Sequence, residues 1–159
     1  MGIFGAIESS ASGLMAQRLR LDLVANNIAN INTTRSSVDS DGNSIPYRRQ
    51  VAVMEPRGKQ GGFADVINRT LADQVGNGVQ ISSVEQDKTP FSLEYDPNSP
   101  DAAKVAKPGV PVGYVQHPNV NIINEMVDMI SASRAYEANV TVINASKSLA
   151  MKALEIGRG

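Results

Sequence analysis

The sequence predicts an α+β protein: long N- and C-terminal helices pair as a coiled coil, and a small β-rich middle unit connects them. Two observations support this fold class. Apolar residues recur every seven positions near both ends of the chain, which is the spacing of coiled-coil helices. All eight prolines lie between Pro46 and Pro118, and proline disrupts helix interiors because it lacks a backbone N–H. The predicted domains are therefore a helical segment at 1–32, a turn-rich middle at 33–118 and a second helical segment at 119–159.

The N-terminal helix is predicted to run from Gly2 to Asn30. Its apolar stripe repeats at heptad spacing through Ile7, Leu14, Leu21 and Ile28. Gly13 lies close to several serines in the first half, and both residue types favour a helix less than alanine does. We therefore expect the first half of this helix to depend on contacts with other elements for its order.

The C-terminal helix is predicted to run from Asn119 to Ile156. Asn119 or Asn121 is the expected N-cap, because an asparagine side chain can accept hydrogen bonds from the first free amides of a helix. Two long heptad-patterned helices at opposite ends of one chain predict that the termini pair with each other. The heptad row consists of Ile122, Met129, Tyr136, Ile143 and Ala150, with Met126, Val140 and Leu154 in the adjacent row.

The middle of the chain is predicted to be extended and rich in turns. A short helix is expected at Phe63–Leu71, with loops at Ser36–Asn43 and Gln60–Gly62. The short strands predict a small β-rich unit and not a large sheet. They are expected within Tyr47–Met54, Gly78–Val84, Phe91–Tyr95 and Gly109–His117.

Composition excludes several classes of function. With 15 basic and 16 acidic residues the formal net charge is −1, so neither a nucleic acid nor an anionic membrane surface is an expected partner. The absence of cysteine excludes disulfides, thiolate metal sites and cysteine nucleophiles. No run of about 20 apolar residues is present, so no direct membrane insertion is expected. No basic leader precedes an apolar segment, so a cleavable signal peptide is not expected either.

No arrangement of residues predicts catalysis, a cofactor or a metal. The single histidine, His117, precedes Pro118 and is interpreted as structural, because a zinc site needs further ligands. The acidic loop that begins at Asp39 lacks the later glutamate of a calcium-binding loop. Glu125 and Asp128 lie three positions apart on the predicted helix, where we interpret them as a solvated or ion-paired face. The chain is therefore predicted not to be an enzyme.

The predicted helices carry few charges: four charged residues in 1–30 and eight in 119–159. A helix on the surface of a soluble monomer normally has one densely charged face. Two interpretations stay open, a sparsely charged two-helix hairpin or helices that pack against several neighbours in an assembly. Asparagines favour the second, because asparagine costs helix stability and is retained where its amide finds partners or fixes register. They are Asn26, Asn27, Asn30, Asn139 and Asn144.

Four segments of the chain resemble the flagellar basal-body rod proteins. Leu23–Thr34 is similar to the N-terminal signature shared by rod and hook proteins. Pro46–Arg49 is similar to the start of the core in the rod subfamily. Gly113–Asn121 and Glu125–Val140 resemble the proximal-rod members in particular. The resemblance implies a structural subunit of the proximal rod.

The resemblance also implies how such a subunit reaches its place. Rod proteins of this kind are expected to be exported unfolded through the flagellar type III apparatus and to polymerise in the periplasm. Their terminal helices are expected to form an inner coiled-coil layer around the export channel, and the β-rich middle an outer layer. Expected partners are copies of the chain itself, other rod proteins, the export apparatus and the basal adaptor to the membrane ring.

The assembly interface is expected to lie on the two terminal helices. Its apolar residues would pack against neighbouring subunits, and its asparagines would set register. Two other interpretations stay open: another rod component, such as a distal-rod protein, or a soluble binding module whose helices close into a hairpin. The expected interface residues are Ile7, Leu14, Leu21, Asn26, Asn27, Ile28, Asn30, Met129, Tyr136, Asn139, Ile143 and Leu154.

Overall fold

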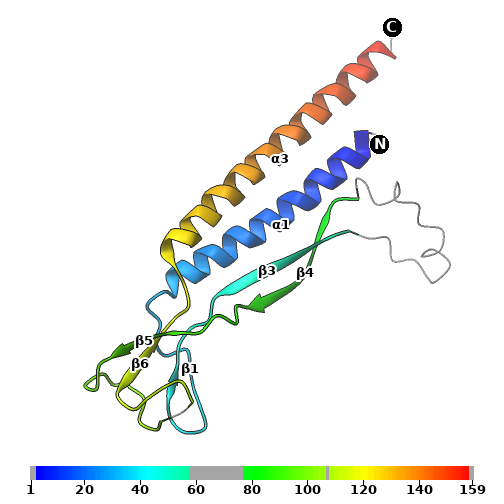
Figure 1. The fold of residues 1–159 in the computed structure, drawn as a ribbon. Coiled ribbons are helices and arrows are strands. Elements are labelled where there is room, and N and C mark those ends of the chain that lie inside the picture. Colours follow the sequence, from blue (N-terminus) through cyan, green and yellow to red (C-terminus); the bar gives the residue numbers. More distant parts are fainter. Residues whose placement is uncertain (1–2, 58–76, 107, 158–159) are drawn as a thin grey trace, which may run out of the picture. The chain divides into compact units, whose positions relative to one another are not determined.

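The computed structural model describes residues 3–57, 77–106 and 108–157 of the chain (Figure 1). Two long helices at the ends of the chain and short strands between them confirm the predicted α+β class. The short helix predicted at Phe63–Leu71 and the loop predicted at Gln60–Gly62 lie outside the described residues. The elements are α1 (Ile3–Ala29), β1 (Ser37–Val38), β2 (Ser44–Ile45), β3 (Gln50–Pro56), β4 (Val79–Gln86), β5 (Ser92–Tyr95), β6 (Tyr114–His117) and α3 (Ile122–Ile156).

The strands pair two by two: β1 with β2, β3 with β4, and β5 with β6. The β5–β6 ladder is antiparallel and places Tyr95 opposite Tyr114. Each of the four predicted strands is present, with its bounds shifted by a few residues. The loop predicted at Ser36–Asn43 is partly wrong, because β1 begins inside it and pairs with β2. Gly42, with a φ of 79°, closes the turn between them, and its amide donates to the Asp39 carbonyl (2.9 Å).

The ends of both helices follow from their polar residues. At the start of α3, the Asn121 side-chain oxygen accepts hydrogen bonds from the amides of Ile123 (2.9 Å) and Asn124 (3.3 Å). Asn121 is therefore the N-cap of the two predicted candidates. After α1, the amide of Thr33 donates to the Asn30 carbonyl (3.0 Å), which turns the chain out of the helix. Neither described helix is long and apolar enough to cross a membrane.

The chain packs as two compact units, each built from separated segments. Unit 1 comprises Met1–Leu21, Ala52–Ser83 and Ile130–Gly159, and unit 2 comprises Asp22–Val51 and Val84–Met129. These units follow from packing, whereas the predicted domains at 1–32, 33–118 and 119–159 follow the order of element types along the chain. The three-domain division stays a prediction.

The buried apolar side chains of the described residues are few and mostly small. In unit 1 they are Ala16 and Ala132, and no described leucine or isoleucine is fully buried in either unit. Alanine lets neighbouring backbones approach closely but removes little apolar area from water. The described part of the chain therefore has only a modest apolar core. Unit 2 contributes Val24, Tyr47, Ala103 and Val115.

Within unit 1, small residues of α1 lie where other segments approach closely. A Cβ atom at Gly13 would lie 3.1 Å from Nδ2 of Asn139, so α1 and α3 are in contact at this point. The Ser12 hydroxyl accepts a hydrogen bond from the amide of Val79 (3.0 Å) and donates to the Ser9 carbonyl (2.7 Å). The residues that lower helix propensity in the first half of α1 therefore make its contacts with other elements: Gly13 with α3 and Ser12 with β4.

Replacing Gly78 with alanine should destabilise unit 1 more than a typical surface substitution does. Gly78 has a φ of 81°, and a Cβ there would overlap the Ser12 hydroxyl. Gly42 has a φ of 79°, and a Cβ there would meet no atom within 4 Å, so Gly42→Ala isolates the backbone cost, about 1–2 kcal/mol. Thermal unfolding of both variants should show the larger loss for Gly78→Ala. Equal losses would mean that the Ser12 side chain moves away from the new methyl group at little cost in free energy.

Candidate functional site

A buried amide and a buried carboxylate lie together in unit 2. Glu125 of α3 is 0% exposed and Asn27 of α1 is 1% exposed, and they are the largest fully buried side chains among the described residues. Asn27 Nδ2 donates to Glu125 Oε2 (3.1 Å). Burying a carboxylate costs free energy unless the carboxylate is paired and hydrogen-bonded. The hydrogen bond from Asn27 therefore offsets part of the cost of burying Glu125.

Asn27 also binds the segment that leads into β3. Its Nδ2 donates to the Gln50 carbonyl (3.0 Å), and its Oδ1 accepts from the Gln50 amide (2.9 Å) and the Tyr47 hydroxyl (2.8 Å). An asparagine amide has two N–H donors and an oxygen with two acceptor sites, and all four are used here. The last turns of α1 are thereby tied to both α3 and Tyr47–Gln50.

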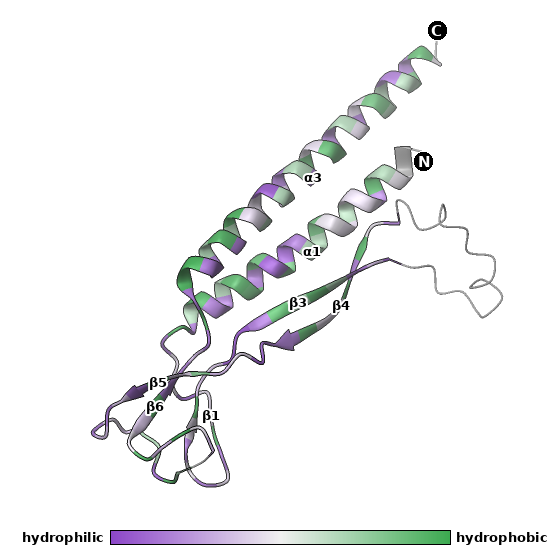
Figure 2. Cartoon of the chain, in the orientation of Figure 1, coloured by the Kyte–Doolittle hydropathy of each residue, from purple (hydrophilic) through white to green (hydrophobic). Residues whose placement is uncertain are grey.

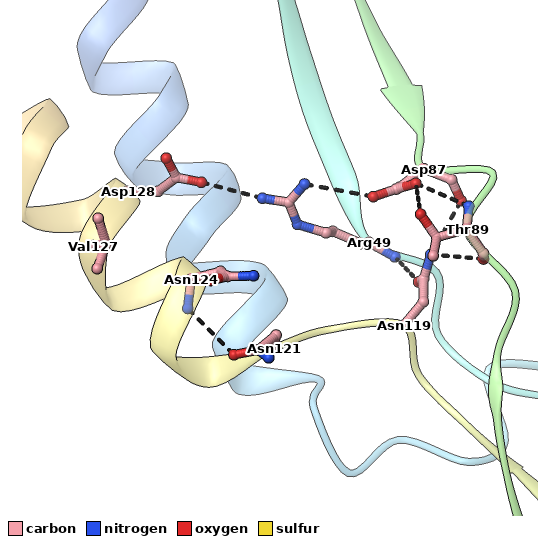
Figure 3. A pocket seen from close by; sticks show the side chains of 8 residues that line it. All are labelled: Arg49, Asp87, Thr89, Asn119, Asn121, Asn124, Val127 and Asp128. Carbon is pink, nitrogen blue, oxygen red and sulfur yellow. Dashed lines mark hydrogen bonds and ion pairs between the residues drawn. The ribbon is translucent and has the colours of Figure 1, made fainter.

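Arg49 carries the positive charge of this cluster. Its Nε donates to Glu125 Oε1. Its two terminal nitrogens pair with Asp128 (3.2 Å) and Asp87 (3.5 Å) (Figure 3). Burial lowers the pKa of Arg49, but the hydrogen bond and charge of Glu125, with the two aspartates, outweigh it and raise the pKa overall. One guanidinium thus serves three carboxylates. We call Asn27, Tyr47, Arg49, Asp87, Asn119, Glu125 and Asp128 the polar network.

Asn119 connects Arg49 to the segment that follows β4. Its Oδ1 accepts from the Arg49 amide (2.9 Å), and its Nδ2 donates to the carbonyls of Asp87 and Thr89 (both 3.1 Å). Hydrogen bonds from the Thr89 hydroxyl and amide, and then the charge of Arg49, lower the pKa of Asp87. These residues line an open hollow of about 500 Å³, together with Asn121, Asn124, Val127 and Asp128 (Figure 3).

Unit 2 should lose stability in acid through Asp87. Its pKa is lower in the folded chain than its ordinary value of 3.8, so its contribution is present above that value and is lost as the pH falls through the folded pKa. We therefore expect unfolding to become easier as the pH falls below about 4, in part because of this group. Urea unfolding across this range should be less pH-dependent for Asp87→Asn. The exposed Asp22, replaced in the same way, is the control, and an equal effect there would contradict the assignment.

The other predicted asparagines of α1 extend the network outward. Asn26 Nδ2 donates to the Tyr47 hydroxyl (3.2 Å). Asn30 Nδ2 donates to the carbonyl and the side-chain oxygen of Asn26 (2.9 and 3.0 Å), and Asn30 Oδ1 accepts from Thr33 (3.1 Å). Asn26 and Asn30, four positions apart on α1, therefore bind each other.

The predicted interface residues differ in how much surface they leave free. Leu154 is 74% exposed, and Tyr136 and Asn26 are also exposed. Asn27 is buried, and its side-chain amide makes all of its hydrogen bonds within the chain. Their role in assembly stays a prediction. The half-buried members are Ile7, Leu14, Leu21, Ile28, Asn30, Met129, Asn139 and Ile143.

Sequence reasoning misses a second set of apolar residues on α3. In unit 2, Ile123 and Val127 are exposed by 68% and 61%, and in unit 1 Leu149 and Ile156 by 62% and 83%. Hydrophobic residues are interspersed with hydrophilic ones along α3 (Figure 2). The heptad row selects one face of α3, and these four residues lie about 100° or more around the helix from that row. Their signal is available in the sequence, because Ile123 and Val127 are four positions apart.

Sequence reasoning also misses most of the polar network. Of the two interpretations of Glu125 and Asp128, the ion-paired one is confirmed and the solvated one is wrong for Glu125. In the sequence, Arg49 is only one of a few basic residues in a predicted strand. The signal that could have found it is a basic residue beside a segment with two acidic residues at helical spacing.

Within the described ranges, no group of three or more histidine, aspartate or glutamate side chains could hold a metal ion. His117 Nε2 instead lies 3.0 Å from Glu94 Oε2, across the β5–β6 ladder. Asp39 accepts a hydrogen bond from the amide of Ser40 (2.7 Å), within the turn after β1. Both residues therefore have structural partners.

Comparison with known proteins gives matches at both ends and over the full length. Residues 7–35 match the family model described as flagella basal body rod protein, and residues 112–156 match flagellar basal body rod FlgEFG protein C-terminal. The flagellar basal-body rod protein FlgC of Borreliella burgdorferi is 49% identical over 100% of both chains. FlgC of Bacillus subtilis is 43% identical, and FlgC of Salmonella typhimurium 34%, each over 99% of this chain and 100% of the relative. The two matched ranges contain Asn27 and Glu125.

Proposed function

Because the chain belongs to the FlgC family of flagellar basal-body rod proteins, we propose that it polymerises through its terminal helices into the proximal rod. The family confirms the resemblance found in the sequence and makes the chain a structural subunit of the flagellar basal body. It also agrees with the prediction that the chain is not an enzyme. Assembly with other rod and basal-body proteins follows from membership of the family.

The exposed apolar side chains of α3 in unit 1 are the observation that supports helix-mediated polymerisation. Fully burying one such side chain contributes about 1.5–3 kcal/mol, so several of them together favour a partner strongly. Polar and charged residues normally occupy the outward face of a helix in a soluble monomer. The side chains are Ile130, Tyr136, Val142, Leu149, Met151, Leu154 and Ile156.

The contact is proposed to repeat head to tail, because such a contact does not close and generates a helical tube. In this tube the terminal helices would form the wall of the export channel, and the rod would act as a periplasmic drive shaft. The predicted interface residues of both helices belong to this proposal. Leu154 and Tyr136 would contact neighbours directly, whereas Asn27 would act by holding its own subunit in shape.

The proposed partners are copies of the chain, neighbouring rod proteins, the basal adaptor to the membrane ring and the type III export apparatus. Export would use that apparatus. A chain with a modest apolar core suits this route, because it can pass unfolded and gain its remaining buried surface on assembly.

Deleting the gene in the source bacterium and imaging detergent-extracted basal bodies by electron microscopy tests this function. We expect membrane rings without a rod and a loss of swimming, both restored by the wild-type gene. Intact rods and hooks in the deletion strain would contradict the proposal. A soluble binding module with closed helices would then be the better interpretation.

A further inference from the structure

We propose that Asn27 and Glu125 form a register clamp, by which we mean that their hydrogen bond fixes which turn of α1 meets which turn of α3. The bond stabilises the folded state of unit 2 in the free subunit, before any neighbour binds. The inference rests on the proposed function, because a free state and an assembled state can be distinguished only for a subunit that assembles. It assigns these residues a positioning role and places no ligand on them.

The clamp is specific because both of its side chains are buried. Advancing a helix by one residue rotates its side chains by about 100°, so a shifted pairing would separate the amide from the carboxylate. Glu125 would then be a buried charge without its donor from α1, which is strongly unfavourable. An apolar contact between helices tolerates such a shift far better, because apolar contacts have no direction.

The clamp needs no second subunit, because every bond it uses lies within one chain. Asn27 and Glu125 are 98 positions apart in sequence, and the segment Tyr47–Gln50 lies between them in the chain order. Asn27 holds that segment through Tyr47 and Gln50, and Arg49 of the same segment binds Glu125. Three separated parts of the chain therefore meet at two buried side chains.

Unit 1 has a different character when it is considered by itself. Its part of α3 leaves Leu149, Leu154 and Ile156 largely in water. The unit 2 part of α3 also exposes Ile123 and Val127, but it carries the buried Glu125, which is bonded to Asn27 and Arg49. Segments with few buried apolar contacts open most readily. We therefore infer an order of events in which unit 2 is already folded in the free subunit and the end of α3 gains its stability on assembly.

Hydrogen exchange on the purified full-length chain, at a concentration where it is monomeric, tests this order. Two backbone amides report on the network directly: Arg49 donates to Asn119 and Gln50 donates to Asn27. We expect them to exchange at least about a hundredfold more slowly than the amides of residues 149–156. Equal exchange rates in the two regions would overturn the inference.

A pair of substitutions separates the clamp from general packing. Asn27→Asp places a carboxylate against Glu125, and it should speed exchange at the Gln50 amide by more than about tenfold. Adding Glu125→Gln restores an amide–carboxylate pair with the roles exchanged, and it should recover part of that protection. No recovery in the double variant would overturn the clamp, because a loss caused only by altered packing is not reversed by exchanging the groups.

A milder variant keeps the test decisive if Asn27→Asp fails to fold. Tyr47→Phe removes one donor to Asn27 and leaves the ring in place, so exchange at Gln50 should rise severalfold while the amides of β6 stay protected. An unchanged rate at Gln50 would count against the network. These measurements use the free chain, so their outcome does not depend on the gene-deletion experiment. If unit 2 is protected in the free chain and the deletion strain still forms rods, the proposed function is refuted and the clamp is not.

Discussion

Replacing Leu154 with glutamate should abolish rod assembly and swimming while leaving the free subunit folded. Leu154 is 74% exposed, so the new carboxylate stays hydrated in the free chain and costs little there. In an assembled helix layer the same carboxylate would lose its water without gaining a partner, at a cost of at least several kcal/mol. Circular dichroism of the purified variant, swimming assays and electron microscopy of basal bodies together measure both parts of the expectation.

The exposed residue Ser148 provides the matched control on the same helix. Ser148→Glu adds the same charge at a polar position, and we expect rods and swimming close to wild type. Leu149→Glu, at a second exposed apolar position, should reproduce the defect of Leu154→Glu. Normal rods in both leucine variants would refute the assignment of this part of α3 to the interface.

Leu154 is a better target than the half-buried heptad residues. A charge at Leu21 or Ile143 should also prevent assembly, but each of these side chains is partly buried in the free chain. Their substitution would therefore destabilise the subunit as well, and a defect in assembly could arise from unfolding. The exposure of Leu154 separates the two effects.

The two long helices can be predicted from the sequence because they depend on local information. The heptad repeats and the absence of proline from both ends set α1 and α3, and the structure places their ends within a few residues of the prediction. Asn121 is one of the two caps that the sequence predicts. The choice between Asn119 and Asn121 cannot be made locally, because Asn119 is occupied by Arg49, Asp87 and Thr89.

Residues with long-range partners are the ones that sequence reasoning interprets least well. Gly13 weakens the first helix by its propensity, whereas in the structure it lies against Asn139, which is far away in the sequence. Glu125 resembles an ordinary surface carboxylate in the sequence, because neither Asn27 nor Arg49 is near it in the chain. Propensity and periodicity describe neighbours along the chain, so they carry no information about such pairs.

Arg49→Ala should strongly destabilise unit 2. It would leave Glu125 at 0% exposure without its cation, and removing one partner of a buried ion pair costs about 3–5 kcal/mol. Arg48→Ala is the neighbouring control. Arg48 lies over the Phe91 ring (4.2 Å) and donates to the Asp87 carbonyl (2.8 Å), so its loss should cost about 1–2 kcal/mol. Urea unfolding at neutral pH measures both losses.

A double-mutant cycle decides whether charge pairing or packing causes the effect of Arg49→Ala. In a Glu125→Gln background the buried charge is gone, so Arg49→Ala should cost less than in the wild type, by about 2 kcal/mol. Arg49→Met keeps most of the aliphatic stem and removes the guanidinium, so it should resemble Arg49→Ala if charge pairing dominates. Additive losses in the cycle, with Arg49→Met close to wild type, would mean that Arg49 acts through its stem. The carboxylates around it would then contribute little to the stability of unit 2.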